Sequence, residues 1–210
     1  MRLVRVTVWR ALIFLLAFVS LACLLGTFYG VWSMRTFACA VYVPAIVVLG
    51  IIAWRTDLPA RWIMHGAAGG LVAAVAYDLF RLPFVLQGAP LFKVFPQFGK
   101  LLLGSSQPRW LVLTLGWSYH FSNGAALGIM FLALLARPTR RNLFWGSVVW
   151  ALFVEATLLL TPYAAFFGLP LDRRFVLLTL SAHLVFGVTL GFWLRSRSEK
   201  LSGNSAAPAS

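Results

Sequence analysis

The chain has 210 residues, of which 61% are hydrophobic and 11% are charged, and its mean hydropathy is +0.87. An ordinary soluble domain carries about 25% charged residues, so this composition excludes that class, and the length suits one membrane domain. The net charge of +13 does not indicate nucleic-acid binding, because the basic residues lie in short clusters between apolar runs, as topology signals do. We expect these clusters to contact anionic membrane lipids.

Six apolar segments are long enough to cross a bilayer as helices, which takes about 17–25 residues each. They predict an all-α, polytopic transmembrane helix bundle, in a single integral membrane domain over residues 1–194. The predicted spans are 8–32, 37–54, 62–80, 111–135, 143–167 and 175–194. Residues 195–210 are polar and rich in small side chains, which predicts a disordered tail.

The distribution of Lys and Arg gives the predicted orientation. If the N-terminus is cytoplasmic, eleven of the 18 basic residues lie on the cytoplasmic side and seven on the outer side. The positive-inside rule therefore favours both termini in the cytoplasm. A compact, Arg-rich, multi-pass chain of this kind indicates the cell membrane, and we predict a bacterial inner membrane.

The outer connection 84–110 does not have the composition of a solvated loop. It contains the apolar run LFKVFPQFGKLLL, which Pro96 and Gly99 interrupt. The run is too short to span a bilayer and too apolar to lie in water. We therefore predict an interfacial or re-entrant element on the outer side of the membrane.

Titratable residues occur within or at the edges of these apolar segments. They are His65, His120, His183, Asp78 and Glu155. The chain has only five acidic residues, and two of them belong to this set. A charged group in a bilayer is costly unless it has a partner, so such residues usually mark a functional site.

Two of the histidines begin the same pattern, H-x3-G-x3-G. One copy starts at His120 and the other at His183, and the repetition hints at an internal duplication. Residues four apart share one helix face, and small residues at this spacing let transmembrane helices approach closely. Each histidine is therefore predicted to face a neighbouring helix. On the third segment Asp78 and Arg81 are three residues apart, which predicts a local ion pair.

The depths of these residues in the membrane agree. At ~1.5 Å rise per residue, His120 and His183 lie ~12–13 Å below the outer end of their segments. Glu155 lies at a similar depth, and Asp78 lies slightly nearer the outside. Four groups from four helices are thus predicted to form an outward-facing intramembrane pocket, whereas His65 lies near the inner end of its segment.

The residue types in this pocket suit metal-dependent chemistry. We predict that His120, His183 and Glu155 bind zinc or iron, since imidazole and carboxylate are ordinary ligands for both metals. Glu155 and Asp78 are the candidate catalytic groups. The candidate substrate-binding residues are Asn123, Arg81 and Tyr119. This interpretation describes a membrane enzyme that acts on a lipid or amphiphilic substrate from the outer leaflet.

Two alternatives use the same residues. Glu155 between two histidines also suits a proton-coupled small transporter. Hydrogen bonds across helices suit a structural or assembly subunit of a membrane complex. A homodimer or a partner membrane subunit is the expected protein partner, and the sequence does not say whether Cys23 and Cys39 pair.

Overall fold

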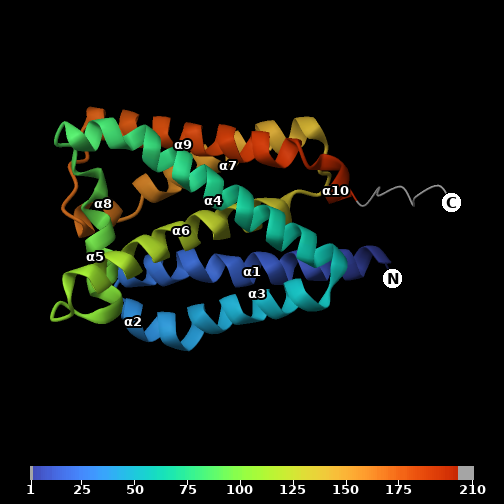
Figure 1. Ribbon diagram of the computed structural model, residues 1–210, viewed down its shortest axis with the longest axis horizontal. Coiled ribbons are helices and arrows are strands. Elements are labelled where there is room, and N and C mark those ends of the chain that lie inside the picture. The colour runs from blue at the N-terminus through green and yellow to red at the C-terminus, as the bar shows by residue number, and fades with distance from the viewer. Residues whose placement is uncertain (1, 203–210) are drawn as a thin grey trace.

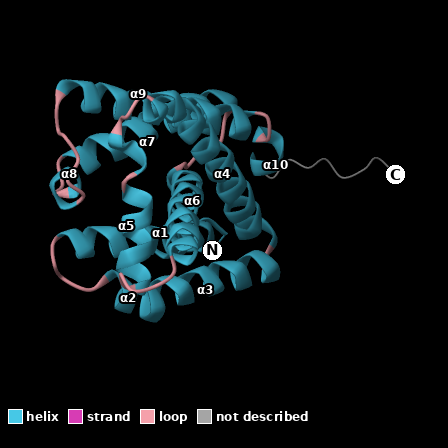
Figure 2. Cartoon of the chain, turned by 60° about the vertical axis from the view of Figure 1, so that its left-hand side comes forward, coloured by secondary structure: helices cyan, strands magenta, loops and turns pink. Residues whose placement is uncertain are grey.

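A computed structural model describes residues 2–202, and these residues form helices and loops without a strand (Figure 2). The structure is 84% helical, which confirms the predicted all-α class. The α-helices are α1 Arg2–Phe28, α2 Met34–Phe37, α3 Val43–Arg55, α4 Asp57–Leu86, α5 Val94–Leu103, α6 Arg109–Leu134, α7 Arg140–Leu159, α8 Tyr163–Phe166, α9 Arg173–Arg195 and α10 Ser198–Ser202. A π-helical segment, Ala38–Tyr42, joins α2 to α3, and a 3-10 turn, Pro90–Phe92, precedes α5.

Five helices in the described part of the chain are long and apolar enough to cross a membrane. They are Val6–Phe28, Met34–Arg55, Asp57–Leu86, Arg140–Leu159 and Arg173–Arg195. The predicted span 111–135 forms most of α6, which has the length of a span but carries the polar stretch WSYHFSN at residues 117–123. The sixth span therefore stays a prediction.

The long helices run back and forth along the molecule, as Figure 1 shows. The start of α1, the end of α9 and α10 lie at one end, which we call the terminal end. The loops before and after α5, together with α8, lie at the opposite end, which we call the α5 end. This arrangement suits termini on one side of a membrane, and their cytoplasmic placement stays a prediction.

Glycine allows two helix pairs to pack with their backbones almost in contact. A Cβ atom added at Gly70 on α4 would lie 2.0 Å from the carbonyl oxygen of Gly124 on α6, and one added at Gly128 would lie 2.1 Å from that of Gly66. On α9, a Cβ atom at Gly187 would lie 2.8 Å from the Cα of Val148 on α7. The glycines that follow each histidine therefore face a neighbouring helix, as the sequence predicts.

Helix α1 lies in the core of the bundle. It packs along α6 and buries Ile13, Ala17 and Cys23. Helix α3 lies outside, against α1 and α4 (Figure 2), and exposes Ile46 and Ile51. Hydropathy alone could not separate these two cases, because both helices are apolar all round.

Several boundaries differ from the predicted ones. Helix α4 continues past residue 80 to Leu86, and α7 ends at Leu159, three residues before Pro162, which cannot donate a backbone hydrogen bond. Part of the predicted tail is helical, because α9 ends at Arg195 and α10 covers Ser198–Ser202, while residues 203–210 lie outside the described residues. Cys23 and Cys39 are both free thiols.

The connection between α4 and α6 contains the amphipathic helix α5. It buries Val94, Phe95 and Phe98 and packs closely on α6, where a Cβ atom at Gly116 would lie 1.9 Å from the carbonyl oxygen of Phe95. The run that is too apolar for water is thus covered by the bundle. Helix α5 closes the end of the molecule that holds the predicted site.

Candidate functional site

The site contains two buried histidine–carboxylate pairs. The first joins His120 Nε2 on α6 to Asp78 Oδ2 on α4, at 2.9 Å. The second joins His183 Nδ1 on α9 to Glu155 Oε2 on α7, at 3.1 Å. The carboxylates are 10% and 3% exposed. Four of the predicted site residues thus come together as two pairs, each between two antiparallel helices.

The glycine patterns explain why each histidine meets a carboxylate. On α6, His120, Gly124 and Gly128 lie along one face, and α4 presents Asp78, Gly70 and Gly66 to that face in the opposite order. The glycines bring the two backbones together. His120 lies one turn beyond Gly124 and Asp78 lies two turns beyond Gly70, so the two side chains come within reach of each other. The close approach of α4 and α6 therefore positions the first pair.

The second pair is built in the same way. A Cβ atom at Gly191 would lie 2.6 Å from Oγ of Ser147 on α7, and the Ser147 hydroxyl donates a hydrogen bond to the carbonyl oxygen of Gly187, at 2.9 Å. Further along the same two helices, His183 meets Glu155. The two helix pairs, α4 with α6 and α7 with α9, therefore share one design, as the repeated sequence pattern suggests.

The partners of each histidine identify the ring nitrogen that carries a proton. His183 Nδ1 lies 3.0 Å from the carbonyl oxygen of Thr179, which can only accept, so Nδ1 must donate. His120 Nε2 faces Asp78, whose other oxygen accepts from Arg81 Nη2 at 2.5 Å, so Nε2 also donates. In the neutral rings, His183 Nε2 and His120 Nδ1 then keep a lone pair that can take up a proton.

Tyr77 and Arg81 connect the two pairs. The Tyr77 ring lies 4.9 Å from the His183 ring and 6.1 Å from the His120 ring, between centroids. The Arg81 guanidinium carbon lies 4.0 Å from the centroid of Tyr77. Arg81 is only 4% exposed, and its Nε–H has no hydrogen-bond partner among the described residues. The predicted Asp78–Arg81 pair is confirmed.

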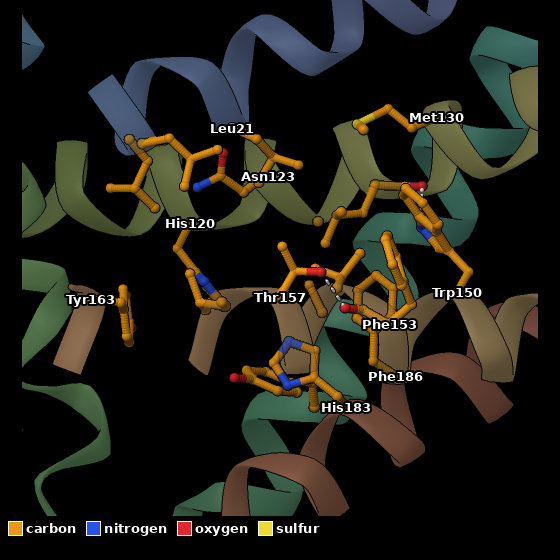
Figure 3. Close-up of a pocket in the computed structure, with 18 of the residues that line it drawn as sticks. Leu21, His120, Asn123, Met130, Trp150, Phe153, Thr157, Tyr163, His183 and Phe186 are labelled. Carbon is orange, nitrogen blue, oxygen red and sulfur yellow. Dashed lines mark hydrogen bonds between the residues drawn. The ribbon is translucent and has the colours of Figure 1, made fainter. Parts of the chain in front are cut away.

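A cavity of about 380 Å³ adjoins both pairs, and most of its wall is apolar. Figure 3 shows His120 and His183 among its lining residues, with Thr157 of α7 between them in this view. Helices α1 and α7 contribute Phe18 and Phe153, which are 36% and 60% exposed. The cavity therefore reaches the surface between α1 and α7, on the side of the bundle.

The α5 end of the cavity is closed by aromatic side chains. Phe95 of α5 lies 4.6 Å from the His120 ring, between centroids, and Phe98 lines the cavity beside it. Tyr163 of α8 lines the same region (Figure 3), and burial raises the pKa of its phenol, so its hydroxyl stays protonated. The polar groups thus lie at the end of the cavity that α5 covers.

Two predicted substrate-binding residues contact α1. The Tyr119 hydroxyl donates to the carbonyl oxygen of Ser20, at 2.8 Å, and Tyr119 is 3% exposed. Asn123 Oδ1 accepts a hydrogen bond from the Ser20 hydroxyl, and Asn123 also lines the cavity. Tyr119 thus joins α6 to α1, whereas Asn123 is available to a bound molecule.

The predicted metal ligands separate into the two pairs. His183 contacts Glu155, but His120 contacts Asp78. No group of three or more His, Cys, Asp or Glu side chains in the described part of the chain is placed to hold a metal ion. Zinc or iron binding stays a prediction, which elemental analysis of the purified protein checks.

Sequence reasoning missed the aromatic groups of the site. Tyr77 precedes Asp78 and lies four residues before Arg81, so it shares a helix face with Arg81. That spacing was the available signal. Phe95 and Tyr163 carried no such signal, because their helices reach the site only through the folded chain.

Comparisons with protein-family models, with curated proteins and with solved structures found no match. The class of this protein is therefore described from its fold and its site. It is an all-helical protein with five helices apolar enough to cross a membrane, and two buried histidine–carboxylate pairs adjoin a lateral apolar cavity.

Proposed function

We propose that the protein is a membrane enzyme that performs acid–base chemistry on an amphiphilic molecule bound in the cavity between α1 and α7. The observation that carries this proposal is the pair of buried histidine–carboxylate contacts beside one apolar cavity. Each histidine has one ring nitrogen held by its partners and one left to exchange a proton. A carboxylate that holds an imidazole in one tautomer is a common arrangement for a general base.

The shape of the cavity favours a substrate that comes from the membrane. Its walls are mostly apolar, and its mouth lies between two helices that are themselves apolar enough to span a bilayer. An alkyl chain can therefore enter from the lipid without crossing water. The head of the molecule would then meet His120, His183 and Arg81 at the α5 end, which is the outer side in the predicted orientation.

The proposal needs no metal ion, because proton transfer by the two histidines supplies the chemistry. A proton-coupled transporter would need a path from the site to the terminal end, where His65 lies. The cavity does extend towards that end as far as Leu134, but this part is lined by apolar residues such as Leu127 and Met130, and His65 is not among the lining residues. We therefore favour an enzyme over a transporter.

The test is a change in lipid composition that depends on the site. Purified protein is incorporated into vesicles of a bacterial polar lipid extract, and lipids are compared by mass spectrometry before and after incubation. His120→Gln and His183→Gln each remove a proton-exchanging nitrogen, and His65→Gln is the matched control outside the cavity. We expect wild type and the control to convert a lipid species at similar rates.

For the two site variants we expect a rate lower by about 10²–10⁴-fold, which is the usual contribution of a general acid or base. The proposal is wrong if the folded wild-type protein leaves every lipid species unchanged. It is equally wrong if all three variants act like the wild type.

A further inference from the structure

We propose that the cavity binds a single-chain amphiphile with a carboxylic acid head, such as a long-chain fatty acid, and that Arg81 recognises the head. This inference deepens the proposed function by naming the substrate class of the same site. It rests on the hydrogen-bonding groups that the site leaves without partners and on the dimensions of the cavity.

Arg81 supplies the first argument. Its guanidinium is buried, and Nη2 donates to Asp78, but Nε–H has no acceptor among the described residues. An unsatisfied donor on a buried charged group costs free energy, so each such group needs an explanation. Arg81 lines the cavity. Nε itself is enclosed, so we expect a ligand oxygen to meet the guanidinium from the side that lines the cavity.

The histidines supply the second argument. Both line the cavity, and each has one nitrogen whose lone pair remains free once its partners are satisfied. The site therefore offers a hydrogen-bond donor at Arg81 and acceptors at His120 and His183. A protonated carboxylic acid matches this set, because its C=O accepts and its O–H donates.

Charge balance favours the acid over other amphiphiles. A fatty acid can enter the membrane in its neutral form, which avoids moving an ion into an apolar medium. When the O–H proton moves to a free imidazole nitrogen, the products are a carboxylate and an imidazolium. The carboxylate then lies beside the Arg81 cation and the imidazolium beside Asp78 or Glu155. The net charge of the site does not change.

The cavity has the form of a channel for one chain. Its α6 wall runs from His120 past Leu127 to Leu134, roughly 21 Å at 1.5 Å per residue. A volume of about 380 Å³ over this length is narrow. Trp150 of α7 lines the cavity away from Tyr163 (Figure 3), and its indole N–H donates to the carbonyl oxygen of Leu127, at 3.1 Å. A chain whose head is at Arg81 must pass Trp150.

Quenching by a brominated ligand tests this placement. Dibromostearic acid carries the quencher in mid-chain, and its methyl ester has the same chain without the acid. Protein in nanodiscs is titrated with each, and the part of the tryptophan quenching that is lost in Trp150→Phe is assigned to the cavity. We expect the acid to bind at least about tenfold more tightly than the ester, since one charge-assisted hydrogen bond gives a preference of this size.

The variants separate head recognition from general charge. Arg81→Gln should abolish the preference for the acid. This variant leaves Asp78 without its counter-charge, so the double variant Asp78→Asn/Arg81→Gln, which removes both charges, repeats the test. Arg109→Gln removes an exposed charge at the same end and should keep the preference. Equal binding of acid and ester by the wild type, or a preference that survives in both Arg81 variants, would overturn the inference.

Failure of the inference is distinct from failure of the proposed function. If acid and ester bind equally while lipid conversion still depends on His120 and His183, the substrate class is wrong and the enzyme proposal stands. If the acid binds with the expected preference but no lipid is converted, the site recognises a carboxylic acid without acting on it. Quenching by neither ligand would overturn the inference directly.

Discussion

Asp78 is the residue on which most of the polar contacts depend. One of its oxygens accepts from Arg81 and the other faces His120, so its carboxylate neutralises a buried guanidinium and orients an imidazole. Both members of the Asp78–Arg81 pair are at most 10% exposed. Removing one member of a buried ion pair leaves the other charge without compensation, and that is more damaging than the loss of an exposed pair.

Asp78→Asn should therefore destabilise the protein by about 3–5 kcal/mol, because Arg81 stays buried without a counter-charge. Thermal unfolding of the detergent-solubilised protein, followed by size-exclusion chromatography, measures the change. Glu199→Gln is the control, since its contact with Arg140 is exposed and such pairs contribute at most about 1 kcal/mol. Equal melting temperatures for the two variants would contradict the role assigned to Asp78.

Tyr77 should act through its ring. Tyr77→Phe keeps the contacts with both histidines and with Arg81, so we expect a protein about as stable as the wild type. Tyr77→Ala removes this half-buried ring and should cost up to about 3–5 kcal/mol, the loss typical of fully buried aromatic side chains. The same melting assay checks both variants, and comparable losses in the two would show that the hydroxyl matters instead.

Residue type was sufficient to find the titratable groups but not to pair them. His120, His183, Asp78 and Glu155 stood out because polar residues are rare in apolar segments. The local Asp78–Arg81 pair followed from a spacing of three. The partner of each histidine lies 28 or more positions away, so its identity depends on how the helices pack.

At the scale of helices, the glycine contacts between α4 and α6 fix the position of the first pair. Gly70→Ala places a methyl group about where the Gly124 carbonyl oxygen now lies, at 2.0 Å, and backbone atoms cannot move aside as a flexible side chain can. We expect the two helices to separate, the melting temperature to fall, and the contact between His120 and Asp78 to lengthen.

Gly50→Ala is the matched control for this prediction. A Cβ atom at Gly50 on α3 meets nothing within 4 Å, and alanine favours a helix over glycine by about 1 kcal/mol. Its melting temperature should equal or exceed that of the wild type. The role of the glycine contact is disproved if Gly70→Ala melts as high as Gly50→Ala.

The sequence predicted the helices well because a long apolar run leaves few other structures. It predicted their neighbours poorly. The glycine pattern correctly indicated close packing for α6 and α9. Helix α1 contacts α6 through hydrogen bonds between Ser20 and the residues Tyr119 and Asn123, and not through a glycine pattern. The polar residues Ser20 and Thr27 in this apolar stretch were the available signal for its buried position.

For the whole molecule, the structure places the start of α1 and α10 at one end (Figure 1). The larger group of basic residues, eleven of 18, is the one assigned to the side of the termini. Of the basic residues assigned to the other side, Arg81 is buried in an ion pair, which strengthens the bias. We therefore expect both termini in the cytoplasm and the loop around Ser106 outside.

Labelling in intact cells measures this orientation. A cysteine introduced as Ser106→Cys, in a chain with Cys23 and Cys39 replaced by alanine, should react with a membrane-impermeant maleimide. Cysteines appended at either terminus should react only after the cells are opened. Labelling of either terminus in intact cells would show that the orientation is the reverse of the predicted one. The geometry of the site would be the same in either orientation.

Asp78 and Glu155 differ in how soon the ribosome synthesises the residue that pairs with each carboxylate. Asp78 has Arg81 on its own helix, three residues later, so α4 can leave the translocon already neutralised. Glu155 has no such neighbour on α7 and contacts His183 of α9, a helix that the ribosome has not yet completed when α7 emerges. A lone carboxylate in lipid is costly. Helices α7 and α9 are therefore expected to enter the bilayer together as one hairpin. During assembly, His183 would first act as the partner of the Glu155 carboxylate, before it takes part in the site.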